Sequence, residues 1–233
     1  MAKPGGRILL HAPVHLRRAG YGTTIGVLTE QVWWTKTFLG LRADLNELPR
    51  VRRARVPLTM EPTSTSLFRG FDHELAHARG FDYVELLLRR GLCDDGVQEL
   101  YVAHHDGSPA YAQWLTRPDD QERLHEHAPG RYDLLEPNEV LLEGAFTFSA
   151  FRRMGAMGHG MSQLLHFAAN EGFTSAITYV AIDNAPSLRG CANVGFDLDH
   201  RRVSVRRFGR RRSYPKPPDE HALQVWAVAT AKR

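Results

Sequence analysis

The sequence predicts a mixed α/β fold: a central, twisted mixed sheet flanked by helices, with a β-rich N-terminal extension. Two patterns alternate along the 233 residues. Short runs of β-branched and aromatic residues favour strands, and stretches with apolar residues three and four apart favour helices. We expect residues 1–50 to form the extension and residues 51–233 to form the main domain. The elements follow the order β, α, α, β, β, loop, β, α, β, α, β, β.

The first half is expected to hold strands at 32–39 and 55–60, helices at 64–78 and 81–90, and a hairpin. Leu67, Phe71, Leu75 and Ala78 have helical spacing, and Gly91 marks the end of the second helix. A turn at 105–108 joins the hairpin strands 100–103 and 110–115. The segment 117–138 is polar and contains three prolines, so it is interpreted as a loop.

The second half predicts a strand at 140–148, an amphipathic helix at 156–171 and a strand at 176–182. In this last strand, apolar residues occupy both the odd and the even positions, which is typical of a strand covered on both faces. Pro186 suits the first turn of a short helix that ends at Gly195. Strands at 203–208 and 223–230 complete the chain.

Composition excludes several classes of protein. With 42% hydrophobic and 24% charged residues, the chain is typical of a globular domain rather than a disordered one. No apolar run approaches the roughly 18 residues of a membrane helix. Its apolar N-terminal stretch is shorter than the roughly 7 residues or more of a secretory signal. Two cysteines cannot form a disulfide framework. We therefore expect a cytoplasmic protein without a membrane partner.

The junction at 151–158 is the feature of the sequence most suited to chemistry. It lies between an expected strand and an expected helix and includes Gly155 and Gly158. Free N–H groups at a helix N-terminus bind anions, glycine permits close approach of a phosphate, and Arg152 and Arg153 can add charge-assisted bonds. An ordinary tight turn between strand and helix would fit the same residues.

The stretch 139–196 resembles the acyl-CoA-binding core of the GNAT superfamily of N-acetyltransferases. That family has an Arg/Gln-x-x-Gly-x-Gly/Ala turn between a strand and a helix, and Arg152, Gly155 and Met157 fall on its positions. Met157 departs from the motif, although Gly158 follows it. Asn184 and the later Gly195-Phe196 resemble the family's Asn-x-x-Ala…Gly-Phe ending, with Ser187 in place of Ala.

The resemblance implies a GNAT-type fold and acetyl-CoA as acyl donor. The turn would hold the pyrophosphate, and the main chain of the preceding strand would pair with pantetheine. Asn184 would contact the pantetheine arm or cap the following helix. The cofactor-binding residues implied in this way are Ala145, Phe146, Thr147, Arg152, Arg153, Met154, Gly155, Ala156, Met157, Gly158 and Asn184.

Transfer to an amine needs a base and, for the departing thiolate, an acid. Glu143 is the candidate base, because burial in an apolar strand would raise its pKa; a structural ion pair or a solvent-facing position is the alternative. Many family members place a Tyr four residues before the Gly of Gly-Phe, where this chain has Cys191. Cys191 is the candidate acid, or else a buried apolar residue.

No metal site is expected. His104-His105 and His125-Glu126-His127 lack the spacing of a zinc motif.

Eight basic residues between His200 and Lys216, with no acid among them, exceed the whole net charge of +4. Because the rest of the chain is net acidic, a general affinity for nucleic acid is not favoured. This arginine stripe suits a solvated strand pair, contact with the 3′-phosphate of CoA, or a platform for an acidic substrate or RNA.

The function expected from these features is acyl-CoA-dependent N-acyltransfer, with acetyl moved to a primary amine on a small molecule, a peptide or an aminoacyl group. The alternative is a non-catalytic protein of GNAT fold that binds acyl-CoA or acts through partners, which Cys191 and Met157 favour. A third hypothesis is an RNA-directed protein that uses the arginine stripe. A homodimer is left open.

Overall fold

The computed structural model describes residues 33–65, 67–94, 99–127, 132–208 and 210–231. One sheet of eight strands forms its centre, in the order β2-β3-β4-β5-β6-β1-β7-β8. The strands are β1 (Trp33–Asp44), β2 (Thr59–Thr63), β3 (Glu99–His105), β4 (Ser108–Thr116), β5 (Glu139–Thr147), β6 (Ser175–Ala181), β7 (Asp197–Arg207) and β8 (Arg210–Lys216). Neighbours are antiparallel except β5 and β6, which are parallel. The mixed α/β fold predicted from the sequence is confirmed.

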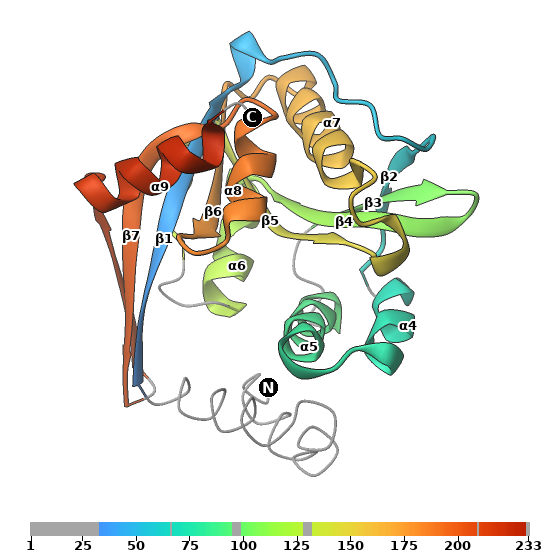
Figure 1. The fold of residues 1–233 in the computed structure, drawn as a ribbon, viewed down its shortest axis with the longest axis horizontal. Helices are drawn as coiled ribbons and strands as arrows, with labels where there is room; N and C mark the ends of the chain where they lie inside the picture. The colour runs from blue at the N-terminus through green and yellow to red at the C-terminus, as the bar shows by residue number, and fades with distance from the viewer. Residues whose placement is uncertain (1–32, 66, 95–98, 128–131, 209, 232–233) are drawn as a thin grey trace.

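Helices cover both faces of the sheet (Figure 1). On one face lie α7 (Ala156–Asn170), α8 (Ala185–Ala192) and α9 (Glu220–Thr230), which share the largest apolar cluster with the strands. On the other face lie α4 (Gly70–His77), α5 (Gly80–Asp94) and α6 (Gln121–His127). Short 3-10 turns at Leu45–Glu47, Pro118–Asp120 and Ser149–Phe151 link the elements.

The hairpin and the central strand–turn–helix are found close to their predicted bounds. The helix expected at 64–78 begins only at Gly70, and the strand expected at 55–60 is displaced to Thr59–Thr63. α7 follows the predicted amphipathic pattern, with Met161, Leu164, Leu165 and Ala168 buried on one side. The hairpin of β3 and β4 turns at Asp106-Gly107, where both residues have positive φ.

The strand predicted at 223–230 is wrong, because this segment is helix α9. Val225, Trp226 and Val228 favour a strand by composition. However, Asp219 caps the helix by accepting a hydrogen bond from the Ala222 backbone N–H at 3.0 Å. Ala222 and Ala229, seven residues apart, are buried on one helical face. The cap and this spacing outweigh the β-branched residues.

The loop predicted at 117–138 is also wrong in part, because it contains α6. Leu124 is the buried residue that fixes this short helix, packing with Leu141 and Ile177. One buried leucine is too weak a pattern to indicate a helix from sequence.

The division of the chain after residue 50 stays a prediction. Of the first 50 residues, 1–32 lie outside the described residues. β1, which follows them, pairs with β6 on one side and with β7 on the other, within the same sheet as the rest of the chain.

Candidate active site

β5 and β6 separate after a short paired stretch. Their pairing covers Glu139 with Ser175, Val140 with Ala176 and Leu141 with Ile177, whereas β5 continues to Thr147 and β6 to Ala181. Figure 1 shows the two strands diverging from this point. Main-chain groups of the diverging segments are thereby released from the ladder and offer donors and acceptors to a ligand.

A bulge in β5 supports this divergence. The register between β4 and β5 shifts between Ala112 and Trp114, and Gly144 in β5 has φ +68°. A Cβ on Gly144 would lie 2.7 Å from the Trp114 ring. Position 144 therefore requires glycine both for its backbone conformation and for space. At the apex of the opening, the Thr178 hydroxyl donates to the Leu142 carbonyl at 2.8 Å.

Arg89 of α5 reaches the bulge from the face that carries α4, α5 and α6. Its guanidinium donates to the carbonyls of Gly144 at 3.2 Å and Ala145 at 3.1 Å, and pairs with Glu85 at 2.8 Å. It also lies 5.3 Å from the Phe146 ring centroid. Ala145 is among the residues expected to pair with pantetheine. Because a carbonyl has two lone pairs, its bond to Arg89 leaves one acceptor position for a ligand.

The turn before α7 presents unused backbone donors. Arg153 has φ +64°, and Gly155, the N-cap, has φ +82°. The first intrahelical bond runs from the His159 N–H to the Gly155 carbonyl at 3.0 Å. The N–H groups of Ala156, Met157 and Gly158 therefore come before the first hydrogen bond of the helix. Gly155 has no side chain that could cap them.

The exposed side chains of Arg152 and Arg153 lie in this turn. Arg152 forms an ion pair with Asp82 of α5 at 3.7 Å. Because both side chains are exposed, this pair contributes little to stability. Donors and cations thus meet where the sequence predicted a phosphate site.

A coil that links β1 to β2 is tied to the start of α7. The Arg55 N–H donates to the Met154 carbonyl at 2.8 Å, and the Arg52 N–H donates to the Ser162 hydroxyl at 3.0 Å. The His159 ring bonds the Arg52 carbonyl at 2.8 Å. The coil segment 53–55, with exposed Arg53 and Arg55, therefore lies beside the turn, whereas the Arg52 guanidinium donates to the Asn193 carbonyl at 2.7 Å.

Glu143 lies on the opposite face from α7, beside the opening. It is two residues beyond the last β5–β6 pair, as is Tyr179 on β6, and residues two apart share a face. Trp114 of β4, which pairs with Glu143 of β5, belongs to the apolar cluster under α4 and α5. Tyr179 packs against the apolar cluster at α6. Glu143 is half-buried. Glu143 and Tyr179 thus flank the opening from its two strands.

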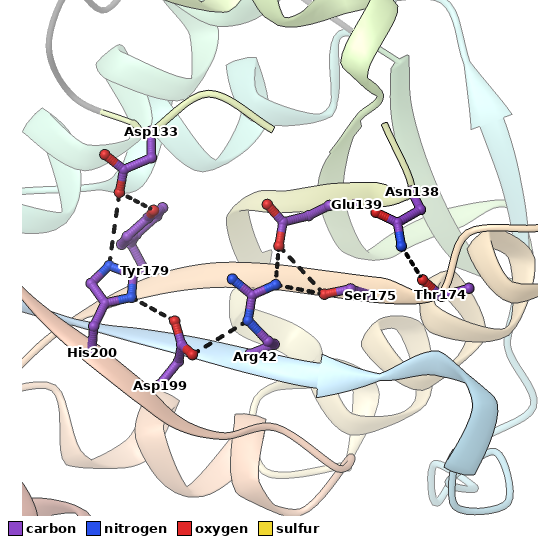
Figure 2. A network of polar contacts seen from close by, with 9 residues as sticks. All are labelled: Arg42, Asp133, Asn138, Glu139, Thr174, Ser175, Tyr179, Asp199 and His200. Carbon is purple, nitrogen blue, oxygen red and sulfur yellow. Dashed lines mark hydrogen bonds and ion pairs between the residues drawn. The ribbon is translucent and has the colours of Figure 1, made fainter. Parts of the chain in front are cut away.

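A polar network continues from Tyr179 across the sheet, as Figure 2 shows. The Tyr179 hydroxyl donates to Asp133 at 3.0 Å. Burial and the Asp133 charge raise the pKa of Tyr179, so the phenol stays protonated near neutral pH. Asp133 also pairs with the buried Arg202, and His200 lies 3.9 Å from it. Gly40 leaves room for the His200 ring, since a Cβ there would lie 2.3 Å from it.

The other half of the network centres on Arg42. It pairs with Glu139 at the start of β5, donates to the Ser175 hydroxyl at 2.8 Å and lies 3.4 Å from Asp199 (Figure 2). Asp199 accepts from His200 at 2.8 Å. Burial alone would raise the pKa of Asp199, but the bonds from His200 and Arg42 outweigh it and hold that pKa below its usual range.

Cys191 and Asn184 lie in structural positions. The Cys191 thiol is 1% exposed within the cluster under α7 and α8, and burial raises its pKa to about 12. It keeps its proton at neutral pH, and its position favours the packing role that the sequence left open. The Asn184 side chain accepts from the Ser187 N–H at 3.2 Å and so caps α8.

Within the described segments, no group of three or more His, Cys, Asp or Glu side chains is arranged to hold a metal ion. His105 bonds the Pro57 carbonyl at 2.9 Å, and His166 bonds the Pro49 carbonyl at 3.0 Å. Among the same residues, no helix is long and apolar enough to cross a membrane.

Sequence reasoning predicted the turn and Glu143, which both lie at the opening, but it gave no role to the other residues there: Arg89, Tyr179, Asp133 and His200. Arg89 is an ordinary arginine within a helical pattern, and the other three come from separate segments. A signal for His200 existed only in Gly40, a glycine within a strand, which indicates a close approach by another group.

No protein-family model matches the sequence, and no curated protein matches it significantly. Solved structures that this chain resembles include a GNAT-family acetyltransferase from Colwellia psychrerythraea, with a TM-score of 0.49 and 16% identity over 78% of this chain and 60% of that one. Another is a putative GNAT-family acetyltransferase from Novosphingobium aromaticivorans, with a TM-score of 0.46 and 14% identity over 74% and 64% of the two chains. A third is a GCN5-related N-acetyltransferase from Sphaerobacter thermophilus, with a TM-score of 0.47 and 12% identity over 88% and 60%.

This chain spans about three fifths of the length of these structures. Similarity of this extent concerns the arrangement of helices and strands and carries no information on substrate. Several of the chains with a similar fold are described as GNAT-family or GCN5-related N-acetyltransferases.

Proposed function

We propose that this protein is an acyl-CoA-dependent N-acyltransferase that moves an acyl group, acetyl in the first instance, to a primary amine. The observation that carries the proposal is the combination of two features. β5 and β6 diverge after three residue pairs, and β5 then leads directly into the glycine turn with free N–H groups at α7. An extended amide-bearing arm ending in phosphates fits such a path.

The residues of this chain fit acetyl-CoA as donor. The N–H groups of Ala156, Met157 and Gly158, with Arg152 and Arg153, would hold the pyrophosphate. Main chain at 145–147 would pair with the pantetheine amides. When bound, acetyl-CoA supplies an acyl thioester, which reacts with a neutral amine. The Asn184 side-chain oxygen already accepts the capping hydrogen bond from the Ser187 N–H. Of the predicted donor-binding residues, Asn184 therefore has the weakest case for contacting acetyl-CoA.

The acceptor amine would approach from the face that carries α5 and α6, since α7 covers the other face. Glu143 lies at the opening on that face and would accept a proton from the ammonium form of the acceptor, directly or through one water. Tyr179, held by Asp133, would form the opposite wall. Arg89 fixes the backbone on which Glu143 is mounted.

A substitution at Gly155 tests donor binding. Gly155→Asp places a side chain at φ +82°, 3.4 Å from Ala54, and a negative charge beside the phosphates. We expect acetyl-CoA affinity, measured by isothermal titration calorimetry, to fall at least about 100-fold, or about 2.8 kcal/mol.

Gly172→Asp is the matched control. It makes the same change at a glycine with φ +94°, beyond the other end of α7, where no atom lies within 4 Å of the new Cβ. Its affinity for acetyl-CoA should match that of the wild type. Equal affinity in the two variants, with both folded, would refute the donor site.

Glu143→Gln tests catalysis separately. It keeps the shape of the side chain and removes its basicity, so kcat should fall by roughly 100-fold or more near neutral pH, the range typical of a lost general base. Acetyl-CoA affinity should change less than about threefold, because main chain and the turn hold the donor. Full kcat in this variant would assign the base elsewhere.

The second candidate is a protein of the same fold that binds acyl-CoA without turnover. The burial of Cys191, at the position where many family members carry Tyr, favours it. Tight acetyl-CoA binding without acylation of any amine in a panel of small amines, peptides and aminoacyl compounds would support this candidate against the first.

A further inference from the structure

The ribbon of β7 and β8 carries a groove that the proposed acyl transfer does not use. Figure 1 shows β7 running with β1 down one side of the molecule, away from α7 and its N-terminal turn. Directly opposed residues of β7 and β8 share a face, and Val205 with Arg212 and Arg207 with Arg210 are such pairs. A cavity of about 600 Å³ lies over this face, lined by Val205, Arg207, Phe208, Arg210, Arg212 and Tyr214.

Three arginines line this groove, and two of them are exposed. Arg207 is held in place by β1, donating to the Trp34 carbonyl at 2.8 Å and to the Thr35 hydroxyl at 3.1 Å. Arg210 and Arg212 are exposed and form no ion pair with any residue in the described segments. These two exposed side chains can therefore donate charge-assisted hydrogen bonds to an anionic ligand.

Two aromatic rings accompany the cations. Phe208, where β7 ends, is 81% exposed, and Tyr214 is 45% exposed in the groove. Exposed rings among guanidinium groups are the arrangement by which proteins stack bases while cations track the phosphates. An anionic membrane fits less well, because Phe208 is the one large apolar side chain exposed at this end of the described ribbon.

We infer that the β7–β8 ribbon binds single-stranded nucleic acid, with phosphates on Arg210 and Arg212 and bases stacked on Tyr214 and Phe208. This binding is separate from the acyl-transfer proposal and stands whether or not the chain is an enzyme. The overall charge of the chain did not favour nucleic-acid binding. This proposal differs because the positive charge is concentrated in one groove.

The test uses the full chain and a fluorescent, unstructured single-stranded RNA of about 12 nucleotides, within the range of sites on single-strand binding domains. Fluorescence anisotropy should give a Kd of about 1–100 µM near physiological salt. The double variant Arg210→Glu/Arg212→Glu should weaken binding at least tenfold and reduce the salt slope by about 1.4. Absence of binding by the wild type at about 100 µM would overturn the proposal.

A matched control separates the groove from overall charge. Arg79→Glu/Arg123→Glu makes the same charge change at exposed arginines next to α4 and within α6. Its affinity for the RNA should stay within about threefold of the wild type, and an equal loss in both double variants would refute a specific site. Tyr214→Ser should weaken RNA binding several-fold by removing a stacking surface; an unchanged affinity would remove the bases from the proposal.

Two further arms identify other occupants. Vesicles with phosphatidylserine that bind the wild type more tightly than the RNA, and lose binding in Arg210→Glu/Arg212→Glu, would replace the proposal by a membrane surface. If acetyl-CoA displaces the RNA at one equivalent, the groove is a donor-phosphate site and the proposal fails. In contrast, RNA binding that persists with saturating acetyl-CoA and in Gly155→Asp would support two separate sites.

Discussion

The face of the sheet that carries α4, α5 and α6 is held together in two different ways. Under α4 and α5, rings pack on one another: Phe71 stacks on Trp114 and Phe148, with centroids 6.0 and 5.7 Å apart. Beside the loop after α6, the contacts are ionic and link Asp133 to Arg202 and Arg42 to Glu139. The proposed acceptor opening lies between these regions. The difference teaches that one wall of the opening depends on shape and the other on charge.

The largest expected effect breaks the aromatic wall. Phe71 is fully buried and contacts four other rings. Phe71→Ala should lower the free energy of unfolding by about 3–5 kcal/mol, measured by urea denaturation. Leu67→Ala, at a residue 76% exposed in the same segment, should change it by less than about 0.5 kcal/mol. A loss below about 1 kcal/mol for Phe71→Ala would mean that the rings cover the sheet without stabilising it.

A smaller effect is expected in the ionic wall. Asp133→Asn leaves the guanidinium of Arg202, 3% exposed, without its carboxylate. Because Asp133 is itself 40% exposed, we expect a loss of about 2 kcal/mol, below the 3–5 of a fully buried pair. Adding Arg202→Met should restore part of it. Asp72→Asn, which breaks the exposed pair with Arg90, should cost less than about 1 kcal/mol. Equal losses at both sites would end the distinction between buried and surface pairs.

The smallest effect is a dependence on pH that, of the two walls, only the ionic one should show. The pKa of Asp199 is held below its usual range, so its contribution is present above the unfolded pKa, about 3.9, and is lost as the pH falls through the folded value. Asp199→Asn should make the unfolding free energy fall less steeply below about pH 4.

Asp219, whose pKa the Ala222 N–H lowers, titrates in the same acidic range. Asp219→Asn therefore serves as a comparison outside the wall. The loss caused by Phe71→Ala should be the same at pH 7 and pH 4, and a pH-dependent loss there would contradict the separation of the two walls.

The sequence alone predicted the part of the site that depends on local structure. Gly155 indicated a turn because a left-handed backbone conformation before a helix favours glycine, and the structure shows φ +82° there. The apolar spacing from Met161 to Ala168 predicted α7 for the same kind of reason, since neighbouring residues decide the pattern. Asn184 was read equally as a ligand contact or a cap, and the cap is observed.

Where long-range contacts decide, prediction from sequence failed. Residues 223–230 have the composition of a strand, but the Asp219 cap and the burial of Ala222 and Ala229 in the main apolar cluster make them a helix. Arg89, Tyr179 and His200 carry no local signal, because their roles depend on which strands become neighbours. β1 entering between β6 and β7 places Gly40 under the His200 ring. Backbone conformation and helical period are properties of a few adjacent residues, whereas the ionic wall exists only once distant strands pair.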